Sequence, residues 1–315
     1  MSDREQLRST LETLSTERVD PAFAQLDLLG TSDQVALMAE QGVVAAQAVA
    51  SERESIARAV DGIVGRLHRG GRLVYIGAGT AGRMGVLDAS EIPPTFGTDP
   101  SLVTGLIAGG EHALRNAVEN AEDDIDAGER AGRELRPDDA IVGISASGRT
   151  PYVVGALRAA REQGAFTVSL ACNRDSEISK HADAPIEVVV GPEVVAGSTR
   201  LKAGTAQKLV INTLSTLAMV QSGKVYGNLM VDVQSTNEKL RARAERTVMH
   251  ATGVTPEAAA AALASADGSV KLAIGIVETG ADAETMRRAL DAAGGNLRQA
   301  LAATSSTTRG AEYAE

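Results

Sequence analysis

Residues 73–97 read LVYIGAGTAGRMGVLDASEIPPTFG, and this stretch decides the fold that we expect. An apolar run, residues 73–76, meets a glycine-rich turn that opens a helix-like segment. That order is typical of a strand, a loop that holds an anion, and a helix. Glu91 lies just before Pro93 and Pro94, which predicts a carboxylate near the end of that helix. Phosphate binding and acid/base chemistry are therefore both predicted within one short segment.

Apolar, β-branched runs alternate with helical patterns on the C-terminal side of this stretch. The runs are LVYI (73–76), SLVTGLIA (101–108), AIVGIS (140–145), FTVSLA (166–171) and IEVVV (186–190). Such alternation predicts an α/β fold: a doubly wound, mostly parallel sheet with helices on both faces. Helical spacing over 33–67 predicts one or two helices before the sheet, and 204–222 predicts a long apolar helix after it.

The sequence is predicted to divide into four parts. These are an N-terminal helical segment (1–55), the α/β domain (56–248), a small helical domain (249–303) and a disordered tail (304–315). The small domain is expected because Thr255 and Pro256 are typical of a helix start, and glycines separate further short helical patterns. Those patterns cover 270–278, 282–292 and 296–302.

The composition excludes several classes of protein. A net charge of −10 over 315 residues argues against nucleic acid as a partner, because its phosphates demand a basic surface. The single cysteine, Cys172, excludes an internal disulfide framework and suits a reducing compartment. No apolar run approaches the ~20 residues that cross a bilayer, and no secretory signal is visible. We therefore expect a cytoplasmic protein with no membrane partner.

The first glycine-rich loop, residues 77–82, matches the G-x-G-x-x-G pattern of dinucleotide-binding proteins. That fold also needs an acidic residue ~20 positions later, at the end of the next strand, to hold the ribose. The next predicted strand, SLVTGLIAGG, ends without one. The pattern alone therefore does not indicate a dinucleotide, although Gly79 and Thr80 remain candidates for contact with a phosphate.

A second loop, residues 145–150 (SASGRT), also follows a strand and opens a helix. Its hydroxyl groups can donate to phosphate oxygens, and the backbone N–H groups at the helix start add further donors. The candidate ligands are Ser145, Ser147, Gly148, Arg149 and Thr150. The alternative is that Ser147 and Thr150 only cap the helix. A third loop, 197–205, contains Ser198 and Thr199, and it either closes over a ligand or caps the long helix.

Carboxylates are the candidate acid/base groups, and Glu91 is the first of them. Its predicted place at a helix C-terminus disfavours the ionised form, which suits a general acid. A second acidic group, Glu119, Glu122, Asp123 and Asp124, falls on an expected helix, ALRNAVENAEDDIDAGER. Position alone does not choose its functional member. The four histidines have no metal-ligand spacing, so no metal site is expected; they are His68, His112, His181 and His250.

Longer strings carry a resemblance to a known family. They are GAGTAGRMGVLDASEIPPTFG, GLIAGGEHALRNAVENAEDD, GISASGRTPYVVGALR, VVGPEVVAGSTRLKAGTAQKLVINTLST and GKVYGNLMVDVQSTNEKL. These strings resemble the N-acetylmuramic acid 6-phosphate etherases, and the resemblance runs from about residue 10 to about residue 303. It implies the sugar isomerase (SIS) fold, a flavodoxin-like sheet, and a cytoplasmic lyase of cell-wall recycling. It further implies a phosphosugar substrate, a homodimer with sites near the subunit interface, and no metal or organic cofactor.

The resemblance also selects the catalytic carboxylates. The Glu of the family's D-A-S-E-x-P-P string is Glu91, and the Glu of its A-E-D string is Glu122. We assign Glu91 as the acid and Glu122 as the base. The sequence departs from the family at Ala81, where Ser is common, and at Ile92, where Cys is frequent. Ala81 removes one hydroxyl, so Thr80, Ser147 and backbone N–H groups are expected to hold the phosphate.

Two other functions share these loops. The first is a non-catalytic phosphosugar sensor, like the glucokinase regulatory proteins and SIS-containing transcription factors. The chain shows no DNA-binding module, and it is short for a regulator with two SIS domains. The second is a phosphosugar isomerase, which would also need a base for the C2 proton. The string from Glu91 to Pro94 favours the etherase.

Overall fold

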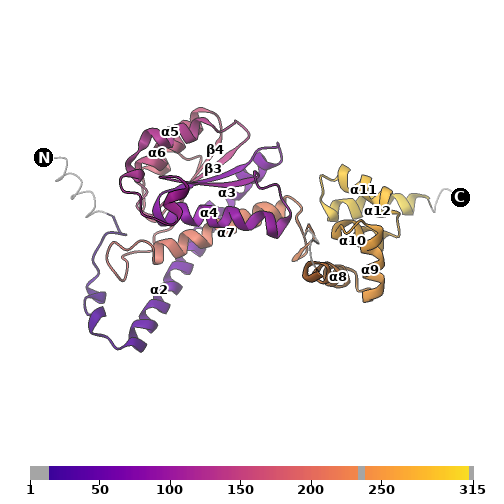
Figure 1. The fold of residues 1–315 in the computed structure, drawn as a ribbon, viewed down its shortest axis with the longest axis horizontal. Coiled ribbons are helices and arrows are strands. Elements are labelled where there is room, and N and C mark those ends of the chain that lie inside the picture. Colours follow the sequence, from indigo (N-terminus) through magenta and orange to yellow (C-terminus); the bar gives the residue numbers. More distant parts are fainter. Residues whose placement is uncertain (1–13, 233–237, 312–315) are drawn as a thin grey trace. The chain divides into compact units, whose positions relative to one another are not determined.

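The computed structural model describes residues 14–232 and 238–311, and it divides into two compact units (Figure 1). The first unit comprises residues 1–90 and 100–215, and the second comprises residues 91–99 and 216–315. The division falls inside two helices, α4 (Gly79–Phe96) and α7 (Lys202–Gln221).

The first unit is built on a five-stranded parallel sheet. Its strands are β1 (Leu73–Gly77), β2 (Val103–Ile107), β3 (Ala140–Ser145), β4 (Phe166–Ala171) and β5 (Ala184–Glu187). The spatial order is β2-β1-β3-β4-β5, and every neighbouring pair is parallel. This order confirms the predicted doubly wound α/β class. The last strand ends at Glu187, so the run predicted as a strand over 186–190 continues as irregular chain.

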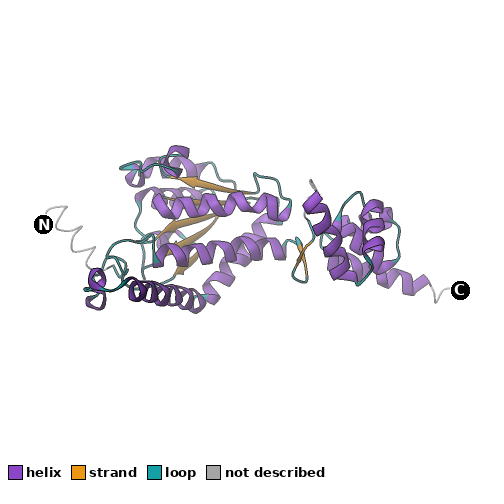
Figure 2. Ribbon diagram, turned by 60° about the horizontal axis from the view of Figure 1, so that its bottom comes forward, coloured by secondary structure: helices purple, strands orange, loops and turns teal. Residues whose placement is uncertain are grey.

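Helices cover both faces of this sheet (Figure 2). The remaining helices of the unit are α2 (Thr31–Ser51), α3 (Arg53–Leu67), α5 (Ile125–Arg133) and α6 (Pro151–Glu162). Alternate side chains of a strand point to opposite faces. Val74, Ile76 and Ile141 pack in one buried cluster with residues of α6. Tyr75 points the other way, where its hydroxyl donates to the Ile211 carbonyl of α7 at 3.3 Å.

Two sequence-based expectations about helices were wrong. The prolines do not end α4, which continues through Pro93 and Pro94 to Phe96. The φ of proline is compatible with a helix, but proline lacks a backbone N–H group. Pro93 and Pro94 therefore each remove one possible hydrogen bond from α4 without ending it. The single helix expected over 113–130 is instead two 3₁₀ turns, η3 (Glu111–Leu114) and η4 (Ala121–Asp123), followed by α5.

The second unit contains a small helical bundle. A two-stranded antiparallel ribbon, β6 (Val225–Tyr226) and β7 (Leu229–Met230), precedes five helices. These are α8 (Glu238–Thr252), α9 (Pro256–Ser265), α10 (Val270–Thr279), α11 (Ala283–Ala292) and α12 (Leu297–Ala311). Thr255 caps α9 by accepting a hydrogen bond from Ala258 N, which confirms the helix start predicted at Thr255 and Pro256.

The borders of this bundle differ from the predicted ones. The border predicted between residues 248 and 249 falls inside α8, because Ala244 and Val248 are buried in one core with α9 and α10. The disordered tail predicted over 304–315 overlaps α12, which is helical to Ala311, and residues 312–315 lie outside the described chain.

Within the described residues, no single helix is long and apolar enough to cross a membrane. One bent pair, α9 with α10, meets the requirement on length and composition alone. Both helices contribute buried residues to the core of the small bundle.

Candidate functional site

The candidate site begins where the central strands β1 and β3 end side by side. Gly77 of β1 pairs with Ile144 of β3, so the loops after the two strands leave the sheet at the same edge. The strand order reverses at this point, since β2 lies on one side of β1 and β3 on the other. Sheets of this type bind ligands in the crevice outside such a reversal. The sequence-predicted phosphate loops therefore meet where this fold favours a ligand.

The loop after β3 gathers three hydroxyl groups. Ser145 Oγ lies 2.8 Å from Thr150 Oγ1 and 3.3 Å from Ser147 Oγ. It also accepts a hydrogen bond from Gly148 N at 3.0 Å. Thr150 is the N-cap residue of α6, yet its side chain makes no capping hydrogen bond to that helix. The hydroxyls are thus held toward one another, and the reading in which Thr150 only caps the helix is not supported.

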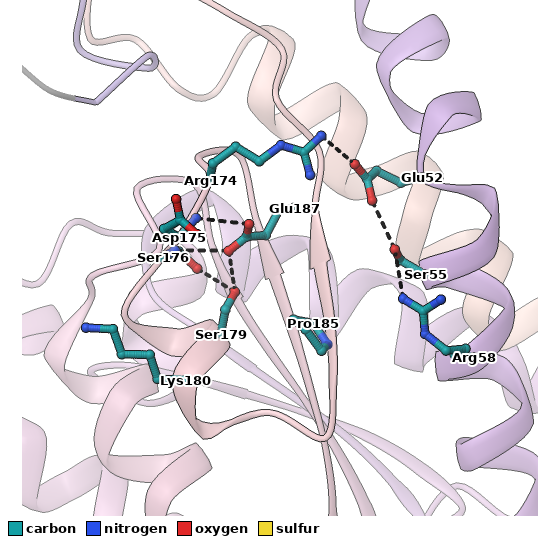
Figure 3. A pocket seen from close by; sticks show the side chains of 10 residues that line it. All are labelled: Glu52, Ser55, Arg58, Arg174, Asp175, Ser176, Ser179, Lys180, Pro185 and Glu187. Carbon is teal, nitrogen blue, oxygen red and sulfur yellow. Dashed lines mark hydrogen bonds and ion pairs between the residues drawn. The ribbon is translucent and has the colours of Figure 1, made fainter.

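The back of this loop rests on the segment after β4. Gly148 adopts φ +74°, and its carbonyl accepts a hydrogen bond from Ile178 N at 3.0 Å. Behind it, Glu187 accepts hydrogen bonds from Asp175 N, Ser176 N and Ser179 Oγ (Figure 3). Burial alone would raise the pKa of Glu187, but these hydrogen bonds lower it below its ordinary value. Glu187 therefore acts as an ionised anchor for the segment that supports Gly148.

A hollow of about 420 Å³ lies beside this anchor, and three of the charged residues that line it, Glu52, Arg174 and Lys180, are already in ion pairs. Arg174 forms an ion pair with Glu52 at 2.9 Å, and Ser55 donates to the same carboxylate (Figure 3). Lys180 pairs with Glu177 at 2.7 Å. The hollow contains none of the sequence-predicted site residues, so it is not the candidate site.

The loops around Thr80 and Thr199 approach each other. A Cβ added to Gly204 would lie 3.4 Å from Thr80 Cγ2 and 3.5 Å from the Thr199 carbonyl oxygen. Gly79 adopts φ +53°, a conformation that glycine reaches without strain. Ser198 and Thr199, which begin the turn into α7, therefore lie on the same side of the sheet as the first loop.

The N-terminus of α7 is not free to bind a ligand anion. Glu193 is buried, and its carboxylate accepts hydrogen bonds from Lys202 N at 2.9 Å and Ala203 N at 3.0 Å. The Lys202 ammonium group instead donates to Gln41 Oε1 of α2 at 2.7 Å. A contribution of the third loop to ligand binding thus falls to its hydroxyls and to the exposed Arg200.

Glu122 lies in a cavity that also includes the first loop. The cavity has a volume of about 420 Å³, and its lining includes Gly79, Arg83, Asn120, Glu122 and Asp123. Asn120 adopts a left-handed backbone at φ +58° and turns the chain into η4, which carries Glu122. The structure thus brings Gly79 and Glu122 together, although their residue numbers differ by 43.

The acidic residues near Glu122 have different roles. Asp124 caps α5 by accepting a hydrogen bond from Ala127 N at 2.8 Å, so its role is structural. Glu122 and Asp123 remain exposed in the cavity lining. The turn at Asn120 separates the role of Asp124 from that of Glu122, and the spacing of the acidic residues did not predict that turn.

Arg83, which sequence reasoning missed, holds the wall of this cavity. Its guanidinium donates to the backbone carbonyls of Ala113 at 2.7 Å and Leu114 at 3.0 Å, with a longer contact to Asn116 at 3.4 Å. These carbonyls begin the segment that leads to Glu122. A planar guanidinium can serve several acceptors at once, whereas an ammonium group cannot match that geometry.

Glu91 lies elsewhere on α4. Its side chain is exposed, it belongs to the second of the two units, and it is not among the residues that line the Glu122 cavity. Since α4 continues to Phe96, Glu91 is also not at a helix end, and the electrostatic reason for choosing it from the sequence was wrong. Its candidacy rests on the D-A-S-E string.

No group of three His, Cys, Asp or Glu residues in the described chain is arranged to hold a metal ion. Cys172 is free and buried, and burial raises the pKa of its thiol to about 12. A thiol with so high a pKa is a poor nucleophile at neutral pH.

Two family models match the part of the chain that contains the five-stranded sheet. The glucokinase regulatory protein N-terminal SIS domain matches residues 55–161, and the SIS domain matches residues 115–217. Among curated proteins, an N-acetylmuramic acid 6-phosphate etherase of Streptomyces avermitilis is 54% identical over 305 residues, covering 96% of this chain and 98% of the relative.

The chain belongs to the N-acetylmuramic acid 6-phosphate etherase family. The etherase of Mycolicibacterium smegmatis is 51% identical over 298 residues, covering 93% of this chain and 99% of the relative. A solved phosphoheptose isomerase of Francisella tularensis aligns with a TM-score of 0.47 at 18% identity, covering 60% of this chain and 98% of that one. Membership of the etherase family confirms the resemblance seen in the sequence strings.

Proposed function

We propose that this chain is a lyase that cleaves the D-lactyl ether of N-acetylmuramate 6-phosphate. The products are N-acetylglucosamine 6-phosphate and D-lactate, and the reaction belongs to cell-wall recycling in the cytoplasm. The observation that carries the proposal is the 54% identity with an etherase across 96% of the chain. The cavity that joins Gly79 to Glu122 supports it, because it places a carboxylate beside a phosphate-type loop.

The phosphate is assigned to the loops that end β1 and β3. The ligands are the hydroxyls and N–H groups of Gly79, Thr80, Ser145, Ser147, Gly148, Arg149 and Thr150, with Ser198 and Thr199 closing the other side. Hydroxyls and helix-start N–H groups hold a dianion without a metal. Ala81 is buried and lacks a hydroxyl, so Thr80 supplies the side-chain donor of the first loop. Holding the phosphate fixes the distant reacting carbons and lowers the entropy cost of reaction.

The chemistry is an elimination followed by a hydration. Opening of the sugar ring exposes an aldehyde at C1, which makes the C2 proton acidic. Glu122 takes that proton, the C3–O bond breaks, and Glu91 protonates the departing lactate oxygen. Water then adds across the C2=C3 double bond, with hydroxyl at C3 and hydrogen at C2. Each glutamate needs hydrogen-bond reach to its atom, ~2.6–3.2 Å or through one water.

The length of α4 supports a site shared between two copies of the chain. Glu91 follows Gly79 by twelve residues of this continuous helix. An α-helix rises about 1.5 Å per residue, so about 18 Å separates the two positions along the axis. That span is greater than the reach of one hexose phosphate. We therefore assign the acid to the partner subunit's Glu91, with the phosphate loops and Glu122 from the first copy.

An exposed apolar face on α2 supports the homodimer. This helix has 21 residues and buries one of them, Ala45. Val35, Met38 and Val43 are exposed on it, with exposed fractions of 63%, 42% and 57%. Several exposed large apolar side chains on one helix favour an interaction site there. A second copy of this chain is the partner that a shared catalytic site requires.

The test is release of D-lactate by the purified full-length protein from N-acetylmuramate 6-phosphate. The proposal expects stoichiometric D-lactate and N-acetylglucosamine 6-phosphate, and a rate lowered on the order of 10²–10⁴-fold with Glu122→Gln. A protein that binds the phosphosugar tightly but releases no lactate would instead be a sensor. A protein that converts an aldose phosphate to a ketose phosphate would be an isomerase.

A further inference from the structure

Asn173, two residues after the end of β4, is a buried residue that joins two distant parts of the chain. Its exposed fraction is 3%. Its Oδ1 accepts hydrogen bonds from both the backbone N and the Oγ of Ser15, each at 2.8 Å. Its Nδ2 donates to Thr16 Oγ1 at 3.0 Å and to the Ala146 carbonyl at 3.1 Å. Both ends of the amide are therefore hydrogen-bonded. The Oδ1 end bonds to the N-terminal segment, and the Nδ2 end bonds to that segment and to the loop after β3.

The Ala146 carbonyl is fixed from two directions. Besides Asn173 Nδ2, it accepts a hydrogen bond from the Cys172 backbone N at 2.9 Å. Ala146 stands between Ser145 and Ser147, whose hydroxyls lie 3.3 Å apart. The placement of Ser147 is thus tied to an amide side chain that itself lies behind the loop.

The N-terminal segment, residues 14–17, is packed rather than peripheral. Leu14 and Thr16 are buried, with exposed fractions of 8% and 0%. Glu17, the next residue, places Oε2 3.3 Å from the position that a Cβ on Gly197 would occupy. Gly197 precedes Ser198 and Thr199 of the third loop. The segment therefore contacts both the Ser147 loop, through Asn173, and the start of the Ser198 loop.

We propose that Asn173 is a positioning residue for phosphosugar binding, and that residues 14–17, held by Asn173, form part of the wall of that site. The inference rests on the proposed function for the role of Ser147. The amide supplies both the acceptor for Ser15 and the donor for Ala146 from one short side chain. Displacement of a binding group by about 1 Å costs on the order of 10²-fold in rate, so an amide behind the loop can control binding without touching the ligand.

Asn173→Asp tests the donor half of this amide. The change keeps an acceptor for Ser15 but places a carboxylate oxygen against the Ala146 carbonyl. We expect KM for N-acetylmuramate 6-phosphate to rise at least about tenfold while kcat changes less, since misplacement acts on binding. Calorimetric affinity for N-acetylglucosamine 6-phosphate should fall by the same factor. Ser15→Ala, which removes one donor only, should give a smaller change in the same direction.

Thr167→Val is the matched control. Thr167 is buried at the opposite end of β4, where its hydroxyl donates to Asp183 Oδ2 at 3.0 Å. This variant should lose stability yet keep the wild-type KM. Thr167→Val therefore shows what a general loss of stability in β4 does to KM, and any larger effect of Asn173→Asp is specific to the carboxyl end of the strand.

Amide hydrogen exchange reports on the packing of residues 14–17 without depending on catalysis. Asn173→Ala should speed amide hydrogen exchange of residues 14–17, whereas Thr167→Val should not. Unchanged exchange in a folded Asn173→Ala, or unchanged phosphosugar affinity in Asn173→Asp, would overturn the inference. If the wild type binds N-acetylglucosamine 6-phosphate but releases no lactate, and Asn173→Asp weakens that binding, the proposed function fails and this inference stands.

Discussion

Gly148 lies against Ser176 so closely that a Cβ on Gly148 would stand 2.3 Å from Ser176 Cβ. The φ of Gly148, +74°, is one that side-chain-bearing residues rarely adopt. Steric room and backbone conformation therefore both require glycine at this bend. The bend in turn directs the Ser145, Ser147 and Thr150 hydroxyls toward one another.

Gly148→Ala should therefore impair ligand binding more than folding. The loop must shift to clear Ser176, which would pull Ser147 away from the phosphate. We expect affinity for N-acetylglucosamine 6-phosphate, measured by calorimetry, to fall at least about tenfold, or about 1.4 kcal/mol. Gly191→Ala is the control, because Gly191 has a similar φ of +72° with no atom near its would-be Cβ. Equal losses in both variants would contradict the proposed close packing as the cause.

Arg83→Met should lower activity through the wall that carries Glu122. The variant loses the hydrogen bonds to the Ala113 and Leu114 carbonyls, so we expect kcat/KM to fall on the order of 10²-fold in the lactate assay. Arg83→Lys should recover part of this loss, because it restores a single cation but not the planar donor array. Arg115→Met, an exposed change in the same segment, should be silent. A silent Arg83→Met would show that the wall holds its shape without this side chain.

The strands and the edge of the sheet that carries the candidate site were predictable because they depend on local patterns. The runs at 140–145 and 166–171 match β3 and β4 residue for residue, since buried parallel strands are continuous apolar runs. Neighbouring loops that follow such strands must meet at one edge of the sheet. The sequence therefore predicted where Ser145 and Thr80 would lie.

Other features were not predictable because their causes lie far apart in the chain. The acidic residues near Glu122 have helical spacing, but the left-handed Asn120 breaks the helix and separates Glu122 from Asp124. The partners of Asn173 include Ser15, which lies 158 positions away. The helix that passes through Pro93 shows that a local rule also fails where the rest of α4 is stable enough to absorb its cost.

The ionised Asp139 carboxylate should stabilise the first unit at neutral pH. Burial alone would raise the pKa of this carboxyl, but hydrogen bonds from Arg136 and Arg72 lower it from 3.8 to about 2. The stabilisation is fully present above the unfolded pKa and is lost as the pH falls through about 2. A shift of this size corresponds to about 2 kcal/mol, so Asp139→Asn should lower the free energy of unfolding by roughly that much at pH 7.

Urea unfolding at several pH values measures this effect. The difference between wild type and Asp139→Asn should shrink as the pH approaches 2. Asp138→Asn is the control, because Asp138 is half-exposed in its ion pair with Arg69 and should change stability by about 0.5 kcal/mol or less. A pH-independent difference would show that shape, not charge, makes Asp139 stabilising.

Mixing two inactive variants tests the shared site. Glu91→Gln and Glu122→Gln should each lose on the order of 10²–10⁴-fold in rate when alone. If each site takes Glu91 from the partner subunit, a mixed dimer contains one intact site and one site lacking both groups. Random exchange of subunits in a two-fold dimer should then restore about a quarter of wild-type activity. No recovery after proven exchange would place both glutamates of a site in one chain.

The roles of the two glutamates follow from a heavy-water experiment. With Glu122 as the base, Glu91→Gln should still exchange the C2 proton of the substrate, because the C2 proton is removed before the lactate oxygen needs an acid. Glu122→Gln should not exchange it. Mass spectrometry of recovered substrate measures the deuterium, and the opposite pattern would reverse the assignment.

The most direct test of the central claim is D-lactate formation from N-acetylmuramate 6-phosphate by the purified chain, without added metal or cofactor. The proposed function predicts one D-lactate and one N-acetylglucosamine 6-phosphate for each substrate consumed, with the rate lowered on the order of 10²–10⁴-fold in Glu122→Gln. Tight binding of the substrate with no lactate released would contradict it.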